Sequence, residues 1–276
     1  MKMKKVLTAV LAGAMCLTAF TACGGSKQSL DSIKKAGKIT MYTNAAFAPF
    51  EYVEGEKVVG VDADIAQAIA DDIGVTLEIQ NVEFTSVLAA ISSGKGSFAA
   101  SGLGIKPERL KEVDFSKVYV TSTQYVIIPE ATNVATFEDL AGFRIGAQDG
   151  TTGFFYVADE VDGTTDEETK EEVKGILQDT GASYKAYSNA VAAVQDMQAD
   201  RLDAVVIDKV PAEVIVKNNP GLKCVPLVYA DGTTTDEEYA IAVQKGNTEL
   251  LDQINKTIDR LISEGKIDEF LTNHVA

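Results

Sequence analysis

The sequence predicts an α/β protein that folds as two lobes, and three observations support this fold class. Strand-like and helix-like segments alternate along most of the chain, which is the pattern of mainly parallel, doubly wound sheets covered by helices. With 276 residues, the chain is long for one hydrophobic core and suits two lobes of roughly 100 to 150 residues each. A composition of 46% hydrophobic and 24% charged residues is typical of a folded soluble body.

The first αβ series begins at residue 38. Its expected elements are, in order, a strand at 38–43, a helix over 65–73, a strand at 75–79 and a short helix over 87–91. The helices are predicted from apolar residues at helical spacing, and the second strand from alternation of apolar and polar residues. Gly74 and Gly94 follow the two helices, where glycine readily adopts the left-handed conformation that ends a helix.

A second series begins at residue 124. Its expected elements are strands at 124–129, 144–147, 204–207 and 239–243, a helix from Thr136 to Leu140, a helix capped by Ser188, and a long helix over 250–262. Ser and Thr are favoured helix caps because their hydroxyls accept a bond from a free backbone N–H. Pro211 suits the first turn of a helix after the strand at 204–207, and Gly265 lies past the end of the last helix.

Residues 1–22 form a predicted lipoprotein signal peptide. Three lysines within the first five residues precede an apolar run at 6–20. That run is shorter than the ~20 residues of a membrane span and suits the hydrophobic region of a secretory signal. Phe20-Thr-Ala-Cys23 then resembles a lipobox with cleavage before Cys23, although Phe20 departs from the usual Leu.

Lipidation of Cys23 would anchor the protein to a membrane, since two acyl chains hold a protein stably where one is marginal. Residues 23–36 are then expected to be a tether between the anchor and the folded body. The alternative is an ordinary cleavage site after Ala22, with Cys23 as a bystander.

The net charge of −16 argues against nucleic acid as a partner, because a phosphate backbone would be repelled. Nine of the acidic residues lie between Asp159 and Asp179, against two lysines. We expect a solvated helix or a mobile loop there, with a docking surface for a transporter or cation as the alternative. Scattered carboxylates make a poor site for a hard cation, and neither a metal nor a cofactor is predicted. Cys224 is expected to be a small buried apolar residue.

Three segments carry a resemblance to a known family. They are Ala-Pro-Phe-Glu-Tyr at 48–52, Gly-Val-Asp-Ala-Asp-Ile-Ala-Gln-Ala-Ile-Ala at 60–70, and Ser-Gly-Leu-Gly-Ile-Lys-Pro-Glu-Arg at 101–109. Together they resemble the bacterial extracellular solute-binding proteins of amino-acid ABC transporters, the polar amino acid binding family 3, with further matches as far as Ile267. The resemblance implies a type II periplasmic-binding-protein fold, the Venus-flytrap, with lobe 2 inserted into lobe 1.

The same resemblance implies a function and a location. The protein is expected to be a monomer that captures a free amino acid in a cleft between the lobes, and hinge closure then encloses the amino acid. It is expected to deliver the amino acid to an ABC transporter permease. Its expected place is outside the cytoplasm, held by the lipid anchor on the outer face of the cell membrane, or on the periplasmic side if there are two membranes.

The resemblance also sets the expected domain boundaries. Lobe 1 is expected to comprise residues 37–120 and 236–276, and lobe 2 residues 124–228. Two hinge segments are expected near 119–123 and 228–238.

An amino acid carries an anion and a cation on one carbon, and a protein that encloses it must pair both charges. For the α-carboxylate, the resemblance points to Arg109, whose planar guanidinium can bind two oxygens at once. The family usually has a hydroxyl residue where this chain has Gly104. We therefore expect more of the contact from Ser101, or from main-chain groups around Gly102 and Gly104.

Lobe 2 is expected to complete the carboxylate site through the loop Gln148-Asp-Gly-Thr-Thr-Gly153, mainly at Thr151 and Thr152. The loop follows a strand and opens a helix, so its N–H groups favour an anion. Asp208, at the end of a strand, is expected to pair with the ammonium. Its alternative role is a simple helix cap.

The expected contacts to the ligand side chain come from two aromatic residues and two amides. Phe47 and Phe84 match family positions whose rings enclose the ligand. Asn44 and Gln148 occupy positions that are charged in some relatives, which favours a neutral polar amino acid over arginine, lysine or glutamate. If a cation were bound instead, Glu51 or Glu83 would have to face the cleft.

The rival hypothesis is an enzyme on the same fold, similar to the cyclohexadienyl or arogenate dehydratases. That chemistry needs a general acid or base beside the ligand. The only histidine, His274, lies three residues from the C-terminus and is a poor candidate, although carboxylates could serve. We therefore predict a binding protein with no catalytic residues.

Overall fold

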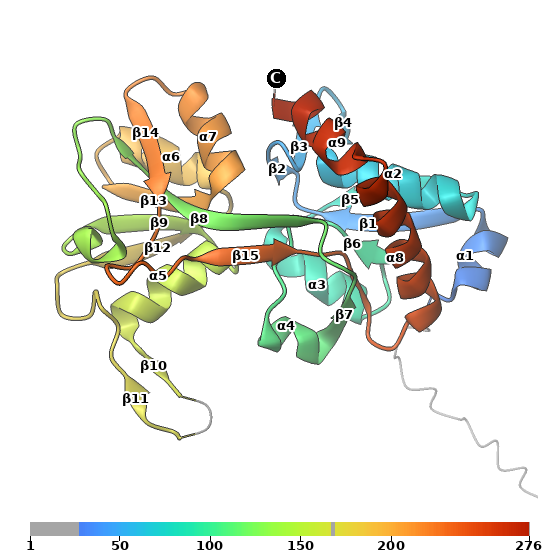
Figure 1. Cartoon of the computed structure of the whole chain (residues 1–276), viewed down its shortest axis with the longest axis horizontal. Coiled ribbons are helices and arrows are strands. Elements are labelled where there is room, and N and C mark those ends of the chain that lie inside the picture. Colours follow the sequence, from blue (N-terminus) through green and yellow to red (C-terminus); the bar gives the residue numbers. More distant parts are fainter. Residues whose placement is uncertain (1–27, 167–168, 276) are drawn as a thin grey trace, which may run out of the picture.

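The computed structural model describes residues 28–166 and 169–275 of the chain. Two lobes lie next to each other, and two long strands run from one lobe to the other (Figure 1). The predicted signal peptide and Cys23 lie outside the described residues. Within the described part of the chain, no helix is both long and apolar enough to cross a membrane.

Lobe 1 is built from two separate stretches of the chain. The first contains α1 (Leu30–Ala36), β1 (Lys38–Thr43), β2 (Ala46–Phe47), β3 (Glu51–Glu54), β4 (Lys57–Val59), α2 (Val61–Ile73), β5 (Thr76–Asn81), α3 (Phe84–Ser92), β6 (Phe98–Ala99), α4 (Pro107–Glu112) and β7 (Val113–Phe115). The second contains β16 (Ala242–Gln244), α8 (Thr248–Ser263) and α9 (Lys266–Val275).

Lobe 2 lies between these stretches in the sequence. Its elements are β8 (Val120–Pro129), the 3₁₀ helix η1 (Phe137–Leu140), β9 (Arg144–Gln148), α5 (Thr152–Asp162), β10 (Thr164–Thr165), β11 (Glu172–Val173), β12 (Ser183–Tyr187), α6 (Ala190–Gln198), β13 (Ala204–Asp208), α7 (Lys209–Lys217) and β14 (Leu222–Pro226). The chain returns through β15 (Asp236–Tyr239). Lobe 2 is therefore inserted into lobe 1, as the fold class requires.

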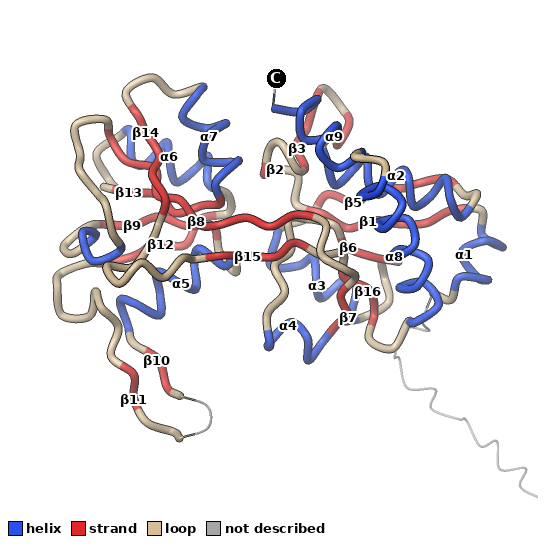
Figure 2. The backbone as a smooth tube through the Cα atoms, in the orientation of Figure 1, coloured by secondary structure: helices blue, strands red, loops and turns tan. Residues whose placement is uncertain are grey.

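Each lobe has a central sheet with helices on both faces. In lobe 1 the strand order is β5-β1-β6-β16-β7, and in lobe 2 it is β12-β9-β13-β8-β14 (Figure 2). The first three strands of each sheet are parallel, but β16 and β8 run antiparallel to their neighbours. The sheets are thus mixed, which corrects the expectation of mainly parallel sheets. Strands that enter or return from the other lobe run against the direction set by the local βα units.

The two crossing strands form one ribbon. The first half of β8 pairs antiparallel with β15, and Thr123 lies opposite Asp236 (Figure 1). The second half of β8 continues into the lobe 2 sheet beside β13. Because both crossing segments are paired strands, the connection between the lobes is a hydrogen-bonded hinge rather than two loose linkers.

Helix α2 shows how the sequence fixes the position of the neighbouring motif at 48–52. Its buried face includes Ile65, Ile69 and Ile73, and it packs with α8 over the lobe 1 sheet. Gly60 precedes the helix at φ 127°, and a Cβ there would lie 2.2 Å from the Phe50 carbonyl oxygen. Only glycine fits this close approach, which fixes the turn between 48–52 and the helix.

Several local predictions are corrected. The expected tether 23–36 ends earlier, because 30–36 form helix α1 and Ile33 is buried in the lobe 1 core. The cap of α6 is Asn189, whose side chain accepts from the Ala192 N–H, rather than Ser188. The strand predicted at 239–243 is divided between β15 and β16, where the chain leaves the hinge and enters the lobe 1 sheet.

The acidic segment also differs from its expected form. Helix α5 extends to Asp162, and the short strands β10 and β11 then form a two-stranded ribbon that projects away from lobe 2 (Figure 1). Cys224, expected to be buried, is a half-buried free cysteine on β14.

Candidate functional site

A small enclosed pocket lies between the lobes where the strand ends of both sheets face each other. It is lined by Asn44, Phe47, Glu51, Phe84, Ser101, Gly102, Arg109, Gln148, Thr151, Thr152, Asp208 and Glu237. Ten of the eleven predicted ligand-binding residues are therefore brought together. The eleventh, Gly104, contacts two of the lining side chains, Arg109 and Glu237. The ligand-binding role of each residue stays a prediction.

Arg109 is buried and reaches both lobes from helix α4. One terminal nitrogen donates to the Gly104 carbonyl in lobe 1 at 2.8 Å, and the other to the Gly150 carbonyl in lobe 2 at 3.0 Å. The Phe84 ring lies against the guanidinium, with 5.7 Å from the ring centroid to Cζ. These contacts hold the charged group at the cleft, where it can meet an anion.

Asn44 and Gln148 form a direct bridge across the cleft. The Gln148 Nε2 donates to Asn44 Oδ1 at 2.8 Å, and Asn44 Nδ2 donates to the Val82 carbonyl at 2.7 Å. The two amides that the sequence assigned to the ligand side chain thus also bind each other.

The two threonines of the lobe 2 loop have different partners. Thr151 caps α5, because its hydroxyl oxygen accepts from the Phe154 N–H at 3.2 Å while the hydroxyl donates to the Gln148 carbonyl. Thr152 donates its hydroxyl to Glu237 at 2.6 Å. Thr152 is therefore the threonine whose hydroxyl binds a carboxyl group. That carboxyl group belongs to Glu237 on β15, a strand that the sequence did not connect to the site.

Asp208 and Glu237 form a pair of buried carboxyl groups. The Gln124 side-chain nitrogen donates to both, at 3.0 Å to Asp208 and 2.9 Å to Glu237. Burial raises the pKa of Glu237 well above its usual range, and the charge of Asp208 adds to the rise; burial raises the pKa of Asp208 as well. Two adjacent buried carboxyl groups oppose each other's ionisation, which favours a single proton shared by the pair.

Glu51 and Asp62 form a second buried acidic pair beside the pocket. Burial raises the pKa of Glu51 well above its usual range, and the Asp62 charge adds to this. Burial also raises the pKa of Asp62, to about 6, although bonds from the Gly102 N–H and the Tyr119 hydroxyl oppose the rise. Glu51 faces the pocket, whereas Glu83, the other candidate, is exposed outside it.

Ser101 and Gly102 are already engaged within lobe 1. The Ser101 hydroxyl donates to Glu51 at 3.0 Å and accepts from the Asn44 N–H at 3.0 Å. The Gly102 N–H donates to Asp62. Ser101 was expected to replace the hydroxyl that is missing at Gly104. Its hydroxyl is bonded to Glu51, which therefore competes with the ligand for it. Phe47 lies over Gly102 and stacks on Phe50 at 5.7 Å between ring centroids.

Glu237 is the pocket residue that sequence reasoning missed, and Glu51 was named only for the case that a cation is bound. Glu51 belongs to the motif at 48–52, so its place beside the motif at 60–70 was a usable signal. Glu237 lies in the acidic run Asp236-Glu-Glu238, where polarity does not reveal which side chain faces inward.

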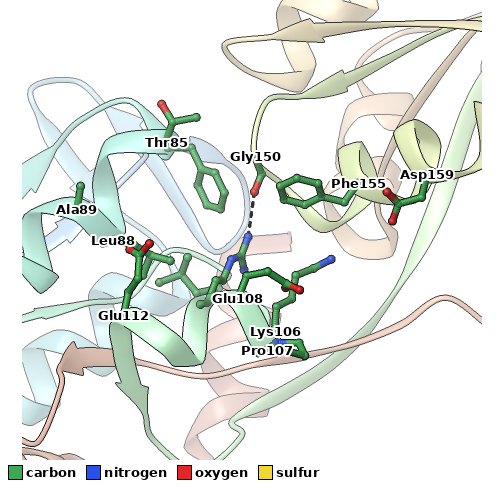
Figure 3. A pocket seen from close by; sticks show the side chains of 13 residues that line it. Thr85, Leu88, Ala89, Lys106, Pro107, Glu108, Glu112, Gly150, Phe155 and Asp159 are labelled. Atoms are coloured by element: carbon green, nitrogen blue, oxygen red, sulfur yellow. Dashed lines mark hydrogen bonds between the residues drawn. The ribbon is translucent and has the colours of Figure 1, made fainter. Parts of the chain in front are cut away.

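A larger open groove of about 780 Å³ adjoins the pocket at Phe84 and Arg109. Helices α3 and α4 of lobe 1 form one side, and Gly150 and Phe155 of lobe 2 form the other (Figure 3). The bond from Arg109 to the Gly150 carbonyl joins these two sides (Figure 3).

His274 lies away from the pocket, on α9. Its ring nitrogens contact Asp64 at 2.8 Å and the Tyr52 hydroxyl at 3.1 Å. The described residues contain no cluster of three or more metal-ligating side chains.

The fold is that of a solute-binding protein of two lobes, and sequence comparison agrees. The family described as bacterial extracellular solute-binding proteins, family 3, matches residues 39–275. This chain belongs to that family.

Individual relatives are similar over nearly their whole length. The arginine-binding extracellular protein ArtP of Bacillus subtilis is 32% identical over 268 residues, which cover 97% of this chain and 96% of the relative. The structure of the substrate-binding protein AbpA of an amino acid ABC transporter from Streptococcus pneumoniae, bound to L-arginine, is 31% identical with a TM-score of 0.77, covering 89% of this chain and 97% of that one. An ancestral arginine-binding protein bound to glutamine is 33% identical with a TM-score of 0.72, covering 86% of this chain and 97% of that one.

Proposed function

We propose that this protein captures a free amino acid between its lobes and delivers it to an ABC transporter permease. The observation that carries the proposal is the pocket, in which Arg109 from lobe 1 and Asp208 from lobe 2 lie among ten predicted ligand-binding residues. Arg109 would bind the α-carboxylate and Asp208 the ammonium. Contacts from both lobes would favour the closed form over the open one, which is the differential affinity that drives closure.

Two ligand classes compete within this proposal. The amides Asn44 and Gln148 favour the neutral polar amino acid expected from the sequence. The buried carboxyl groups favour a cationic one. If each acidic pair holds one proton, the two pairs carry two negative charges and Arg109 one positive charge. A neutral zwitterion would leave one charge unbalanced, whereas a cationic amino acid would balance it.

Glu51 supplies the specific observation for the cationic class. No N–H or O–H group among the described residues donates to its buried Oε2 atom, whose carboxyl group can share a proton only with Asp62, and Glu51 lines the pocket. A buried acceptor without a partner is unfavourable, and a guanidinium or ammonium group would satisfy it. We therefore place the cationic class first and the neutral polar class second. The arginine-binding relatives support this order.

Thermal-shift measurements with each of the twenty amino acids will test the function and rank the classes. A ligand at about 100 times its Kd stabilises the folded state by about 2.7 kcal/mol, which raises the melting temperature measurably. The largest shift is expected with arginine, lysine or histidine. A largest shift with glutamine or asparagine would favour the neutral class, and no shift with any of the twenty would refute amino-acid binding.

The enzyme alternative would have to use the carboxyl groups of the pocket, such as Glu51 and Glu237, as its general acid or base. The one histidine contacts Asp64 and Tyr52 on lobe 1 and does not line the pocket. Prephenate and arogenate turnover by the purified protein would contradict the assignment as a binding protein.

We further propose that the protein acts as a monomer, anchored outside the cytoplasm by acyl chains on Cys23. Cys23→Ala should abolish incorporation of radiolabelled fatty acid and leave an uncleaved or soluble chain, because the thiol that carries the lipid is missing. The measurement is membrane fractionation with lipid labelling. Normal processing and acylation of the variant would refute this anchor.

A further inference from the structure

Glu237 is a buried acid on the crossing strand β15. Its side chain faces inward, while the neighbouring Asp236 and Glu238 are exposed, as strand alternation requires. The residue is only 8% exposed. Glutamate is seldom buried to this extent unless its carboxyl group has dedicated partners.

The Glu237 carboxyl group contacts two elements and the loop that precedes α4. Oε1 accepts the Thr152 hydroxyl of α5 at 2.6 Å, and Oε2 accepts Nε2 of Gln124 on β8 at 2.9 Å. The same Oε1 lies against Gly104 so closely that a Cβ at residue 104 would be within 1.9 Å of it. The carboxyl group therefore lies between the lobes and fills the place where any larger residue 104 would project.

These surroundings match the groups assigned to the ligand carboxylate. Arg109, the main chain at Gly104 and the hydroxyl of Thr152 were each expected to bind that anion. Thr152 and Gly104 contact Glu237 directly, and the charge of Arg109 acts on the same carboxyl group by lowering its pKa, against the larger effects of burial and Asp208.

We propose that Glu237 is an internal carboxyl group that occupies the ligand-carboxylate site and must be displaced by the α-carboxylate of a bound amino acid. This inference rests on the proposed function. It makes Glu237 a determinant of affinity and selectivity, because it competes only with ligands that carry a carboxylate.

The size of the pocket supports displacement. Beside the side chains that line it, the pocket has a volume of only about 20 Å³. That is room for about one water molecule, so an amino acid enters only when lobes or side chains move. The Thr152 hydroxyl, which also lines the pocket, donates to the Glu237 carboxyl group, so departure of that group frees the donor for the ligand.

Gly104 and Glu237 form a matched pair in this arrangement. A serine at 104 would bring both a Cβ and a hydroxyl into the space that the Glu237 carboxyl group fills. It would expel that group and restore the hydroxyl that the family usually has there. Gly104→Ser is thus a second, independent way to relieve the competition without changing Glu237.

Isothermal titration calorimetry of the full-length chain with L-arginine, L-glutamine and agmatine will test the proposal. Agmatine is arginine without its carboxylate. Glu237→Ala, Glu237→Gln and Gly104→Ser should bind the amino acids about tenfold more tightly or better, the factor expected when one charge-assisted hydrogen bond need not be exchanged. Agmatine affinity should stay within about twofold for Glu237→Ala and Glu237→Gln, because agmatine does not compete for the site.

Glu238→Ala, an exposed neighbour on the same strand, is the matched control and should behave as the wild type.

Each other outcome overturns the proposal. Weaker amino-acid binding by Glu237→Ala and Glu237→Gln would make Glu237 a partner of the ligand, and unchanged binding would make it structural. An equal gain for agmatine would show that the gain does not depend on the carboxylate.

If the wild type binds amino acids and the variants bind no better, only this inference fails. If neither the wild type nor the variants bind any of the twenty amino acids, the proposed function fails with it. Circular dichroism identifies any variant that does not fold, and Glu237→Gln, which keeps the shape of the side chain, then decides.

Discussion

At the residue scale, Arg109 is the point where the lobes and the ligand would meet. Its guanidinium is buried and donates to one carbonyl in each lobe. It is also the one positively charged side chain that lines the enclosed pocket, among the residues that the structure describes. A ligand anion would bind a group already held in place, so little further ordering of this side chain would be needed.

Arg109→Ala should abolish amino-acid binding while the chain remains folded. A hydrogen bond to a charged group contributes about 1.5 to 3 kcal/mol, so loss of a two-point contact weakens binding by about 100-fold or more. Calorimetry with the best ligand of the thermal-shift screen measures the effect.

The matched control is Arg201→Ala, which removes an exposed arginine paired with Asp196 on the surface of lobe 2. That variant should bind as the wild type does, since an exposed pair contributes about 1 kcal/mol or less, and only to stability. Unchanged affinity in Arg109→Ala would remove Arg109 from the ligand site.

Single residues were predictable where a local motif names them. Arg109, Gly102 and Ser101 share one segment, and all three line the pocket. The contact between Glu237 and Gly104 was not predictable, because it joins residues far apart in the sequence through backbone pairing of residues 103–105 with 238–240. No periodicity or spacing within either segment encodes that distance.

At the element scale, the sequence predicted elements best where apolar residues are regular. Helix α8 shows this, since Leu250, Ile254, Ile258 and Leu261 form its buried face. Helix α9 went unpredicted although Ile267, Phe270 and Leu271 recur at helical spacing and pack on the lobe 1 core. The crossing strand β15 was hidden for a physical reason: its inward residues are Glu237 and Tyr239, so its buried face is partly polar.

The hinge elements explain why a polar strand can be buried. Strand β15 pairs with β8 along its length, so its backbone groups are bonded without a hydrophobic face. The inward side chain of Glu237 is then satisfied by Gln124 from β8 and Thr152 from α5. Hydrogen bonds across the ribbon hold β15 in place where apolar burial would hold another strand. The hydropathy of a sequence does not reveal such bonds.

At the scale of the whole molecule, each lobe has its own hydrophobic core. The buried members of two clusters, which include Phe137, Ile145, Val194 and Val205, all belong to the inserted lobe. Its entrance and exit lie together, since the Gln124 N–H donates to the Thr235 carbonyl at 3.1 Å. We propose 124–228 as the body of lobe 2, with 37–120 and 236–276 forming lobe 1.

A fragment of residues 124–235 should therefore fold alone. About 110 residues is an ordinary domain size, and the fragment holds the whole of both lobe 2 clusters. Urea unfolding followed by circular dichroism should show one cooperative transition. A fragment of equal length, 90–201, lacks β13 from the middle of the sheet and should show none. A non-cooperative 124–235 fragment would contradict the proposed boundaries.

The complementary construction should fold as well, and neither part should bind an amino acid. Thr123 and Asp236 face each other across the ribbon, so a short turn can join them and close lobe 1 without lobe 2. Arg109 would then lie in one protein and Asp208 in the other. Each alone would pair only one charge of an amino acid, and the other charge would stay in water. Calorimetry should show binding only by the intact chain, because the free energy of closure comes from contacts that both lobes make to the same ligand. Binding by the isolated lobe 1 at the affinity of the intact chain would show instead that Asp208 and the rest of lobe 2 contribute nothing to recognition.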